Sequence, residues 1–295
     1  MPARKSGSGF SFRNHLAPFA PVALALAMGS TGKHNAPSVT STAAKDNAPT
    51  AMLTTGKPNA PGVAAGTFTP VGPLPFAGVR NSPADDHCGI DGGNPDPAKQ
   101  AEARAKNNFG AATQPPQVIT YEELVSLQSQ SANIPKRLPD RTMVVSKGEG
   151  KFVSYVAFIK DAHYSDVAAG EAVNCNIPGD ATNDIHIVLL KDLAQDECMS
   201  TTAEMSPHYR PPDWTPANLL KASAGHPVRV QGQLFFDGSH TPCSGNSRPN
   251  PKRASLWELH PVYSVEVCTQ TTIADCQGSA AEWTSLEDVL GSGQH

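Results

Sequence analysis

The sequence is poor in aromatic and charged side chains. Phe, Trp and Tyr make up 6% of its 295 residues and Asp, Glu, Lys and Arg 17%, whereas it contains 27 Pro and 24 Gly. This composition supplies too little apolar bulk to pack the whole length around one core. Because the apolar residues concentrate after about residue 150, we predict a single domain of ordinary size behind a long disordered N-terminal extension.

The sequence also lacks the short motifs that identify common catalytic and metal sites. None of its six cysteines forms a Cys-x-x-Cys pair, which argues against zinc-ribbon and thioredoxin-like sites. It has no His-Glu-x-x-His, His-x-His or Gly-x-Ser-x-Gly motif and no Walker-type phosphate loop. No cofactor is therefore identified, and the missing motifs favour a binding protein over an enzyme.

Positive charge is scarce in the second half of the chain. From Ser146 onward there are 10 Lys and Arg against 18 Asp and Glu, a balance of −8, while the preceding residues carry +4. An acidic domain repels phosphate backbones, so we do not expect nucleic acid as a partner.

The N-terminus has the pattern of an export signal over residues 1–29. Arg4, Lys5 and Arg13 precede a short apolar stretch, "APVALALAMG". This stretch is too short to span a bilayer, so we expect no transmembrane segment once the signal is removed. A periplasmic or secreted protein is predicted; the alternative is a disordered Ala-rich tail.

The dispersed cysteines of an exported chain are best interpreted as disulfides. Six cysteines allow fifteen pairings. Proximity along the chain favours Cys268 with Cys276 and Cys175 with Cys198, and leaves Cys88 without a partner.

Residues 30–118 are predicted to be a disordered linker. It contains "KHNAPS", "KDNAPT" and "KPNAPG", which start twelve residues apart at Lys33, Lys45 and Lys57. These units lack the apolar residues that a solenoid would need, so a flexible tether is favoured. One short helix fits "DPAKQAEARAKNN" within this linker.

Residues 119–145 are predicted to hold a short helix and a lead-in to the domain, and residues 146–295 the domain itself with a C-terminal helix. This short amphipathic helix covers "WTSLEDVL" and is expected to close the barrel, with partner binding as the alternative. The helix covers 120–130, with Thr120 and Glu123 in a capping-box arrangement. Beyond residue 146, short apolar runs separated by turn residues predict strands, and "TPANLLKASAG" has the punctuation of a helix. The predicted strands span 151–161, 184–190, 199–206, 227–237 and 255–267, and the predicted helix spans 215–223.

Five strands with a helix between the third and fourth follow the order of the OB-fold barrel. The segments "HPVRVQGQLFFDGSH" and "RASLWELHPVYSVEV" resemble the last two strands of OB-fold domains of the tRNA-anticodon-binding-like kind. They also resemble exported bacterial proteins that carry a similar "LHPV" strand. The resemblance covers residues 146–268 and implies that a ligand would bind across strands two and three.

Alternation along these strands separates an apolar face from a polar one. In the last strand, Trp257, Leu259, Pro261, Tyr263, Val265 and Val267 are expected on the core face. The polar face then carries Glu258 and His260, with Asp184 and His186 from strand two and Glu204 from strand three. Pro261 cannot donate a ladder hydrogen bond, which predicts a sheet edge or a bulge.

The four residues His186, Glu204, Glu258 and His260 should share one outward surface. Their side chains suit a divalent metal, for which His186, His260 and Glu204 are the candidate ligands, or acid–base chemistry. Asp237 and His240 could approach from the side. The competing interpretation is that these residues only solvate the outer face of a half-exposed sheet.

A loop before the predicted helix carries a second candidate surface. His208, Tyr209 and Arg210 lie between prolines and close to Trp214, a composition common in binding loops. Tyr209 and Trp214 could instead close one end of the barrel.

These features give three functional hypotheses. The first is an exported OB-like binding module for an unknown small molecule, peptide, glycan or protein partner, which would use the face of strands two, three and five. The second is a metal-dependent hydrolase of the phosphodiesterase or nuclease class that uses His186, Glu204, Glu258 and His260. Nucleic-acid binding follows from fold analogy alone, and the acidic balance opposes it.

Overall fold

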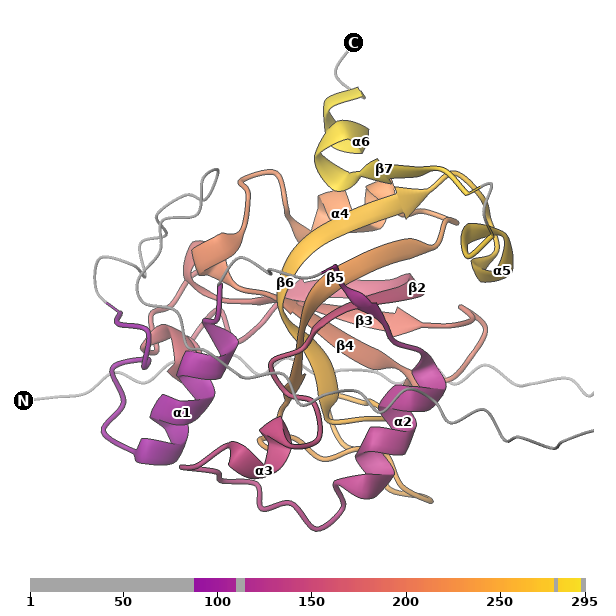
Figure 1. Ribbon diagram of the computed structural model, residues 1–295. Coiled ribbons are helices and arrows are strands. Elements are labelled where there is room, and N and C mark those ends of the chain that lie inside the picture. Colours follow the sequence, from indigo (N-terminus) through magenta and orange to yellow (C-terminus); the bar gives the residue numbers. More distant parts are fainter. Residues whose placement is uncertain (1–87, 110–114, 279–280, 293–295) are drawn as a thin grey trace, which may run out of the picture. The chain divides into compact units, whose positions relative to one another are not determined.

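The computed structural model describes residues 88–109, 115–278 and 281–292 (Figure 1). The predicted signal peptide, the twelve-residue repeat and the rest of the linker up to residue 87 lie outside the described residues. Among the residues that are described, no helix combines the length and the apolar character that a membrane span requires.

The strands are β1 (Gln117–Val118), β2 (Phe152–Tyr164), β3 (Ile185–Leu190), β4 (Thr201–Met205), β5 (Val228–Phe236), β6 (Trp257–Cys268) and β7 (Trp283–Ser285). The helices are α1 (Pro97–Lys106), α2 (Tyr121–Gln130), α3 (Thr142–Val145), α4 (Pro216–Ala222), α5 (Ile273–Cys276) and α6 (Leu286–Ser292). Four short 3-10 helices complete the described elements: η1 (Ala172–Asn174), η2 (Asp180–Thr182), η3 (Glu197–Met199) and η4 (Pro207–Tyr209).

Five strands close into a barrel in the order β2–β3–β4–β6–β5, and β5 pairs back to β2 (Figure 1). The pair β4–β6 is parallel and the other four barrel pairs are antiparallel. The predicted fold class, a mainly β domain built on a five-stranded barrel, is confirmed. All five predicted strands are present within three residues of their predicted ends.

Helix α4 lies between the third and fourth barrel strands, as predicted. The Thr215 hydroxyl accepts from the Asn218 amide, and Pro216 occupies the first turn. Gly225 follows with a φ of +78°, the left-handed conformation that ends many helices. The helix buries Leu219 in the barrel core and contacts β2.

Helix α2 has the predicted capping box between Thr120 and Glu123. The Ser255 hydroxyl donates to the Leu124 carbonyl, and the Trp257 indole donates to the Ser131 hydroxyl just beyond the helix (2.9 Å). These contacts place α2 against the start of β6.

The C-terminal segment differs from the predicted helix over "WTSLEDVL". Its first three residues form β7, which pairs with the end of β6, and the helix α6 begins only at Leu286. Leu286 is buried in the barrel core, and α6 contacts α4 and β6. The apolar pattern was thus correctly assigned to packing against the barrel, but pairing with β6 overrides helix propensity in the first residues.

Two register shifts interrupt the pairing of β6 with β5 around Pro261 and Tyr263. They move Val262 into the core, whereas the Tyr263 hydroxyl donates to the Asn108 carbonyl outside it (2.5 Å). The predicted bulge is confirmed. The prediction that Tyr263 lies in the core was wrong, because each extra residue of the bulge reverses the alternation of side chains between the two faces of the strand. Strand β6 is not a sheet edge, because it pairs with β4, β5 and β7.

The end of the predicted linker is an ordered part of the domain. Residues 88–109, which we call the strap, contain α1, capped by the Asp96 side chain. Gln233 of β5 donates to the Ala105 carbonyl (2.8 Å) and accepts from the Asn108 side chain (2.5 Å). The short helix expected over "DPAKQAEARAKNN" is confirmed as α1. The assignment of its flanking residues to a disordered linker was wrong because their order depends on contacts with the barrel, which composition does not reveal.

The structure contains the disulfides Cys88–Cys175, Cys198–Cys243 and Cys268–Cys276. The predicted pair Cys268–Cys276 is confirmed, whereas the pairing of Cys175 with Cys198 and the unpaired Cys88 were wrong. Sequence proximity failed because the fold brings the strap and the loop after β5 beside distant segments. The disulfides fit an oxidising compartment.

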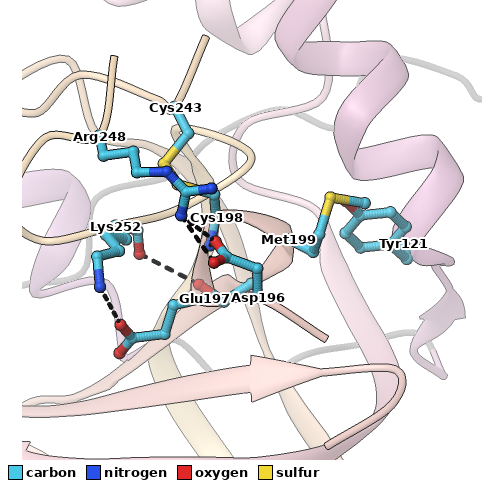
Figure 2. The surroundings of a disulfide bond; sticks show 9 residues. Tyr121, Asp196, Glu197, Cys198, Met199, Cys243, Arg248 and Lys252 are labelled. Carbon is cyan, nitrogen blue, oxygen red and sulfur yellow. Dashed lines mark hydrogen bonds and ion pairs between the residues drawn. A yellow bond between two sulfur atoms is a disulfide. The ribbon is translucent and has the colours of Figure 1, made fainter. Parts of the chain in front are cut away.

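Figure 2 shows the disulfide Cys198–Cys243, which joins η3 to the loop between β5 and β6. Two ion pairs span the same contact: Arg248 with Asp196 (2.7 Å) and Lys252 with Glu197 (2.9 Å). Arg248 and Lys252 therefore attach this loop to η3 and the residue before it.

Candidate functional site

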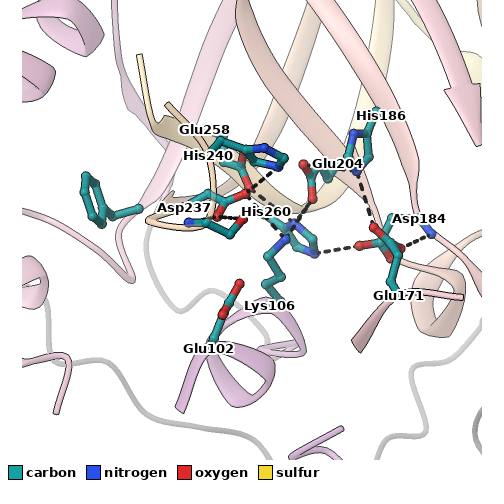
Figure 3. Close-up of polar contacts among 12 residues, drawn as sticks. Glu102, Lys106, Glu171, Asp184, His186, Glu204, Asp237, His240, Glu258 and His260 are labelled. Atoms are coloured by element: carbon teal, nitrogen blue, oxygen red, sulfur yellow. Dashed lines mark hydrogen bonds and ion pairs between the residues drawn. The ribbon is translucent and has the colours of Figure 1, made fainter. Parts of the chain in front are cut away.

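Seven acidic and imidazole side chains meet on the outer face of the barrel beneath the strap (Figure 3). We call them the acid–imidazole cluster, and they are Glu171, Asp184, His186, Glu204, Asp237, Glu258 and His260. Glu204, Glu258 and His260 are 0% exposed, so the expectation that this face meets water was wrong. The faces were assigned correctly, but Lys106 and its neighbours in the strap cover the polar one.

Glu204 of β4 lies at the centre of the cluster. One carboxylate oxygen is 3.2 Å from His186 Nε2, and the other is 2.7 Å from His260 Nδ1 and 3.1 Å from Lys106 Nζ. His186 faces Glu204 directly across the β3–β4 ladder, and the β4–β6 pairing brings in His260. Burial raises the pKa of Glu204, but the charges of His186, Lys106 and His260 outweigh it and hold that pKa well below its usual range.

Asp184 and Glu171 form one side of the cluster. Asp184 Oδ2 is 3.5 Å from His260 Nε2, and Glu171 Oε1 is 3.5 Å from His186 Nε2. The Asn174 amide donates to both carboxylates (3.2 Å each), which fixes them relative to each other. Glu171 and Asn174 lie in the loop between β2 and β3, where no strand periodicity could have indicated them.

Asp237 and Glu258 form the opposite side. Arg253, which is 1% exposed, donates to Glu258 (2.9 Å) and lies 4.0 Å from Asp237. His240 Nε2 is 3.3 Å from Asp237 Oδ2, which is the lateral approach expected from the sequence. Arg253 lies in the basic loop segment "NPKR", and nothing in that segment indicated that its side chain is buried.

Negative charge in the cluster exceeds what its neighbours neutralise. Burial and the Glu171 charge raise the pKa of Asp184 to about 6. Burial and the charges of Glu204 and Asp237 raise the pKa of Glu258 to about 7. Burial and Lys106 lower the pKa of His260, but Glu204 and Asp184 outweigh them and bring it to about 10. The cluster therefore retains protons near neutral pH, the usual sign of a site that lacks positive charge.

Two sets of three ligand atoms have the spacing of a metal site. Asp184, Glu204 and His260 form one set, and Glu204, Asp237 and Glu258 the other, each with atoms within 4.8 Å of one another. The sequence had suggested His186 as the third ligand beside Glu204 and His260; Asp184 takes that place. His186 still contacts Glu204 from the side.

Several of these atoms make no hydrogen bond of acceptable geometry within the described part of the chain. They are Asp184 Oδ2, Glu204 Oε1, Asp237 Oδ2, Glu258 Oε1 and both ring nitrogens of His260. Buried polar atoms are normally satisfied, so this concentration of unsatisfied atoms is unusual for a folded protein.

The residues of the second candidate surface do not join the cluster. Arg210 donates to the carbonyls of Asn183 (2.8 Å) and Asp180 (2.7 Å). Tyr209 stacks on Phe109 of the strap with 5.6 Å between ring centroids. His208 Nε2 lies 3.2 Å from Asn174 Oδ1, and the Asn174 amide in turn contacts the cluster. This loop holds neighbouring segments together, and Trp214 belongs to the barrel core.

Fold and site together define a disulfide-linked five-stranded barrel with a buried acid–imidazole cluster. Comparisons with known protein families, curated proteins and solved structures give no match. Its function is therefore inferred from the chemistry of the cluster.

Proposed function

We propose that this protein is a periplasmic or secreted binding module whose barrel binds a divalent metal ion between Asp184, Glu204 and His260. The observation that carries the proposal is that three buried ligand atoms converge within 4.8 Å while atoms of all three side chains lack hydrogen bonds in the described residues. The three disulfides support the compartment.

The ligand set suits Zn²⁺ or Mn²⁺, which bind carboxylate oxygen and imidazole nitrogen together. Bonds of about 2.0–2.2 Å place neighbouring ligands of a tetrahedral ion about 3.3–3.6 Å apart. Because the ligand atoms lie within 4.8 Å of one another, the side chains have to close on the ion by about 1 Å. An ion would also replace the positive charge of the His260 ring, whose Nδ1 atom faces Glu204 and whose Nε2 atom faces Asp184.

A large ligand on the same face is less well supported. The strap covers the strands on which the resemblance to OB-fold domains predicts ligand binding. Hydrogen bonds from Gln233 and Tyr263 hold the strap in this place. A peptide or glycan would first have to displace these contacts, whereas an ion needs only the space among the ligand atoms.

Metal titration of the full chain tests the proposal. After treatment with a chelator, the protein should bind one equivalent of Zn²⁺ or Mn²⁺ at pH 7.5, as measured by calorimetry and elemental analysis. Asp184→Asn should weaken binding at least about 100-fold, because one of three ligands loses its charge. His226→Ala is the matched control, since this histidine bonds to the Gln270 carbonyl at the far end of β5 and should bind as wild type. Wild-type protein that binds neither metal, or Asp184→Asn that binds normally, would refute the site.

A metal-dependent hydrolase is the second candidate, and His240 favours it. Its side chain is 28% exposed and lies at the rim of the cluster beside Asp237. Burial lowers the pKa of His240 despite the Asp237 charge, so the ring is neutral near pH 7 and able to accept a proton.

This candidate predicts metal-dependent hydrolysis of a phosphodiester such as bis(p-nitrophenyl) phosphate. His240→Ala should abolish most of the turnover while leaving metal stoichiometry unchanged. Equal turnover by the metal-free protein, or none with either metal, would leave binding as the function.

A further inference from the structure

Lys106 is the last residue of α1, and its ammonium group projects from the strap into the acid–imidazole cluster (Figure 3). The residue is only 6% exposed. Its Nζ is 3.1 Å from Glu204 Oε2 and 3.9 Å from Asp237 Oδ2. Lysine is almost never fully buried unless it is paired. The Lys106 ammonium group therefore occupies the position that a bound cation would take among these carboxylates.

That site is the second set of ligand atoms, from Glu204, Asp237 and Glu258. All three side chains are 0% exposed, and their ligand atoms lie within 4.8 Å of one another. Asp237 Oδ1 accepts from Ser239, and Glu258 Oε2 accepts from Arg253. The other oxygen of each carboxylate makes no hydrogen bond within the described chain. Of these two oxygens, Asp237 Oδ2 is 3.9 Å from Lys106 Nζ, and Glu258 Oε1 is 3.6 Å from His260 Nδ1.

Lys106 is one of the cations that compensate the negative charge at this position. Three carboxylates face Lys106, Arg253 and the His260 ring, which lies 2.7 Å from Glu204 and 3.6 Å from Glu258. Removing the Lys106 ammonium group leaves one negative charge uncompensated, and a divalent ion can supply the positive charge. Buried charge is strongly destabilising when it is uncompensated, so this exchange is favoured electrostatically.

We propose that Glu204, Asp237 and Glu258 form a second cation position, which Lys106 fills and which a divalent ion binds when that ammonium group is removed. Three carboxylates favour hard, oxygen-preferring ions such as Mn²⁺ or Mg²⁺. The inference rests on the proposed function because the two positions share Glu204, whose Oε2 atom contacts both His260 and Lys106. The wild type then binds one divalent ion, and its own lysine substitutes for the second.

The test is the Mn²⁺ stoichiometry of Lys106→Met, which keeps the length of the side chain and removes its charge. Equilibrium dialysis should give one Mn²⁺ for the wild type and two for Lys106→Met. Two ions bridged by one carboxylate should also give the electron paramagnetic resonance spectrum of a coupled pair. Lys99→Met on the same helix is the control, because Lys99 pairs with Glu102 and not with the three carboxylates among the described residues, so the stoichiometry should stay at one.

Two further variants separate the positions. In the Lys106→Met background, Asp237→Asn should remove the second ion only, and Asp184→Asn the first only. If Lys106→Met still binds one ion, the second position is refuted and the proposed function stands. If the wild type binds none and Lys106→Met binds one that Asp237→Asn removes, the second position is supported and the proposed function fails.

Folding provides a readout if Lys106→Met is unstable. The variant should then regain its native circular dichroism spectrum when Mn²⁺ is added, because the ion replaces the lost charge. The doubly substituted Lys106→Met/Asp237→Asn should fold without metal, since it removes one charge of each sign. Unfolding of Lys106→Met in the presence of saturating Mn²⁺ would overturn the proposal.

Discussion

Glu204 shows how one side chain can organise a buried site. It contacts His186, His260 and Lys106 through two oxygens, so its negative charge is shared among three basic groups. Its neighbours were placed by the β3–β4 register and the β4–β6 pairing rather than by any local motif. The position of Glu204 is thus fixed by the pairing of β4 with both β3 and β6. Its substitution should therefore disturb His186, His260 and Lys106 together.

Glu204→Gln tests this dependence at the scale of a residue. The substitution keeps the shape but leaves Lys106 and the histidines without their central anion, and we expect a loss of about 3–5 kcal/mol in unfolding free energy. Urea denaturation of the metal-free protein measures it. Glu266→Gln, which weakens a partly exposed pair with Arg229, should lose about 1 kcal/mol or less. Equal losses in the two variants would contradict the central role of Glu204.

At the scale of elements, the strap and the barrel strands differ in how far the sequence reveals them. Alternating apolar residues predicted every barrel strand, and His186, Glu204, Glu258 and His260 followed from the same alternation. Lys106 was not found, because an Ala-rich helix beside a Pro-rich linker resembles a tether. Glu171 was missed because it lies in an irregular loop. Burial of the polar face could not be predicted, because it depends on the docking of the strap.

The covalent link between the strap and the barrel gives a second prediction. Cys88–Cys175 spans 87 residues, so replacing both cysteines with serine should lower the unfolding free energy by about 2–4 kcal/mol, chiefly by freeing the unfolded chain. Amide hydrogens of α1 should then exchange faster than those of β5. The corresponding Cys268→Ser/Cys276→Ser variant, which opens a span of 8 residues, should lose less stability and leave exchange in α1 unchanged. Unaltered α1 exchange in the first variant would show that noncovalent contacts alone hold the strap.

For the molecule as a whole, the cluster should make stability depend on pH. Burial raises the pKa of Asp184 and Glu258 to about 6 and about 7, so their folded forms bind protons more tightly than the unfolded chain does. The pKa of His260 is likewise raised, to about 10, from its ordinary value of 6.5. All three contributions are lost as pH rises, whereas that of Glu204, with its lowered pKa, is lost as pH falls below its ordinary 4.5.

The metal-free protein should therefore be most stable at about pH 5, and its Tm should fall by at least about 3 °C between pH 5.5 and pH 8. Saturating Zn²⁺ or Mn²⁺ should reverse this trend, because the ligands must lose protons to bind the ion. Scanning calorimetry across this pH range, with chelator and with metal, measures both effects. A metal-free Tm that rises steadily from pH 5.5 to pH 8 would contradict the excess of negative charge.

Most residues of the cluster lie in or directly beside successive barrel strands. They therefore follow a recognisable pattern of short sequence motifs. Reading along the chain, Asp-x-His begins at Asp184, a single Glu follows at 204, Asp-x-x-His begins at Asp237, and Glu-x-His-Pro begins at Glu258. Long and variable loops can separate these four short motifs without moving the side chains, because the pairing of the barrel strands brings the motifs together. A search for these four motifs in this order, with the loop lengths left free, would find other chains that carry the same cluster even where the rest of their sequence has diverged.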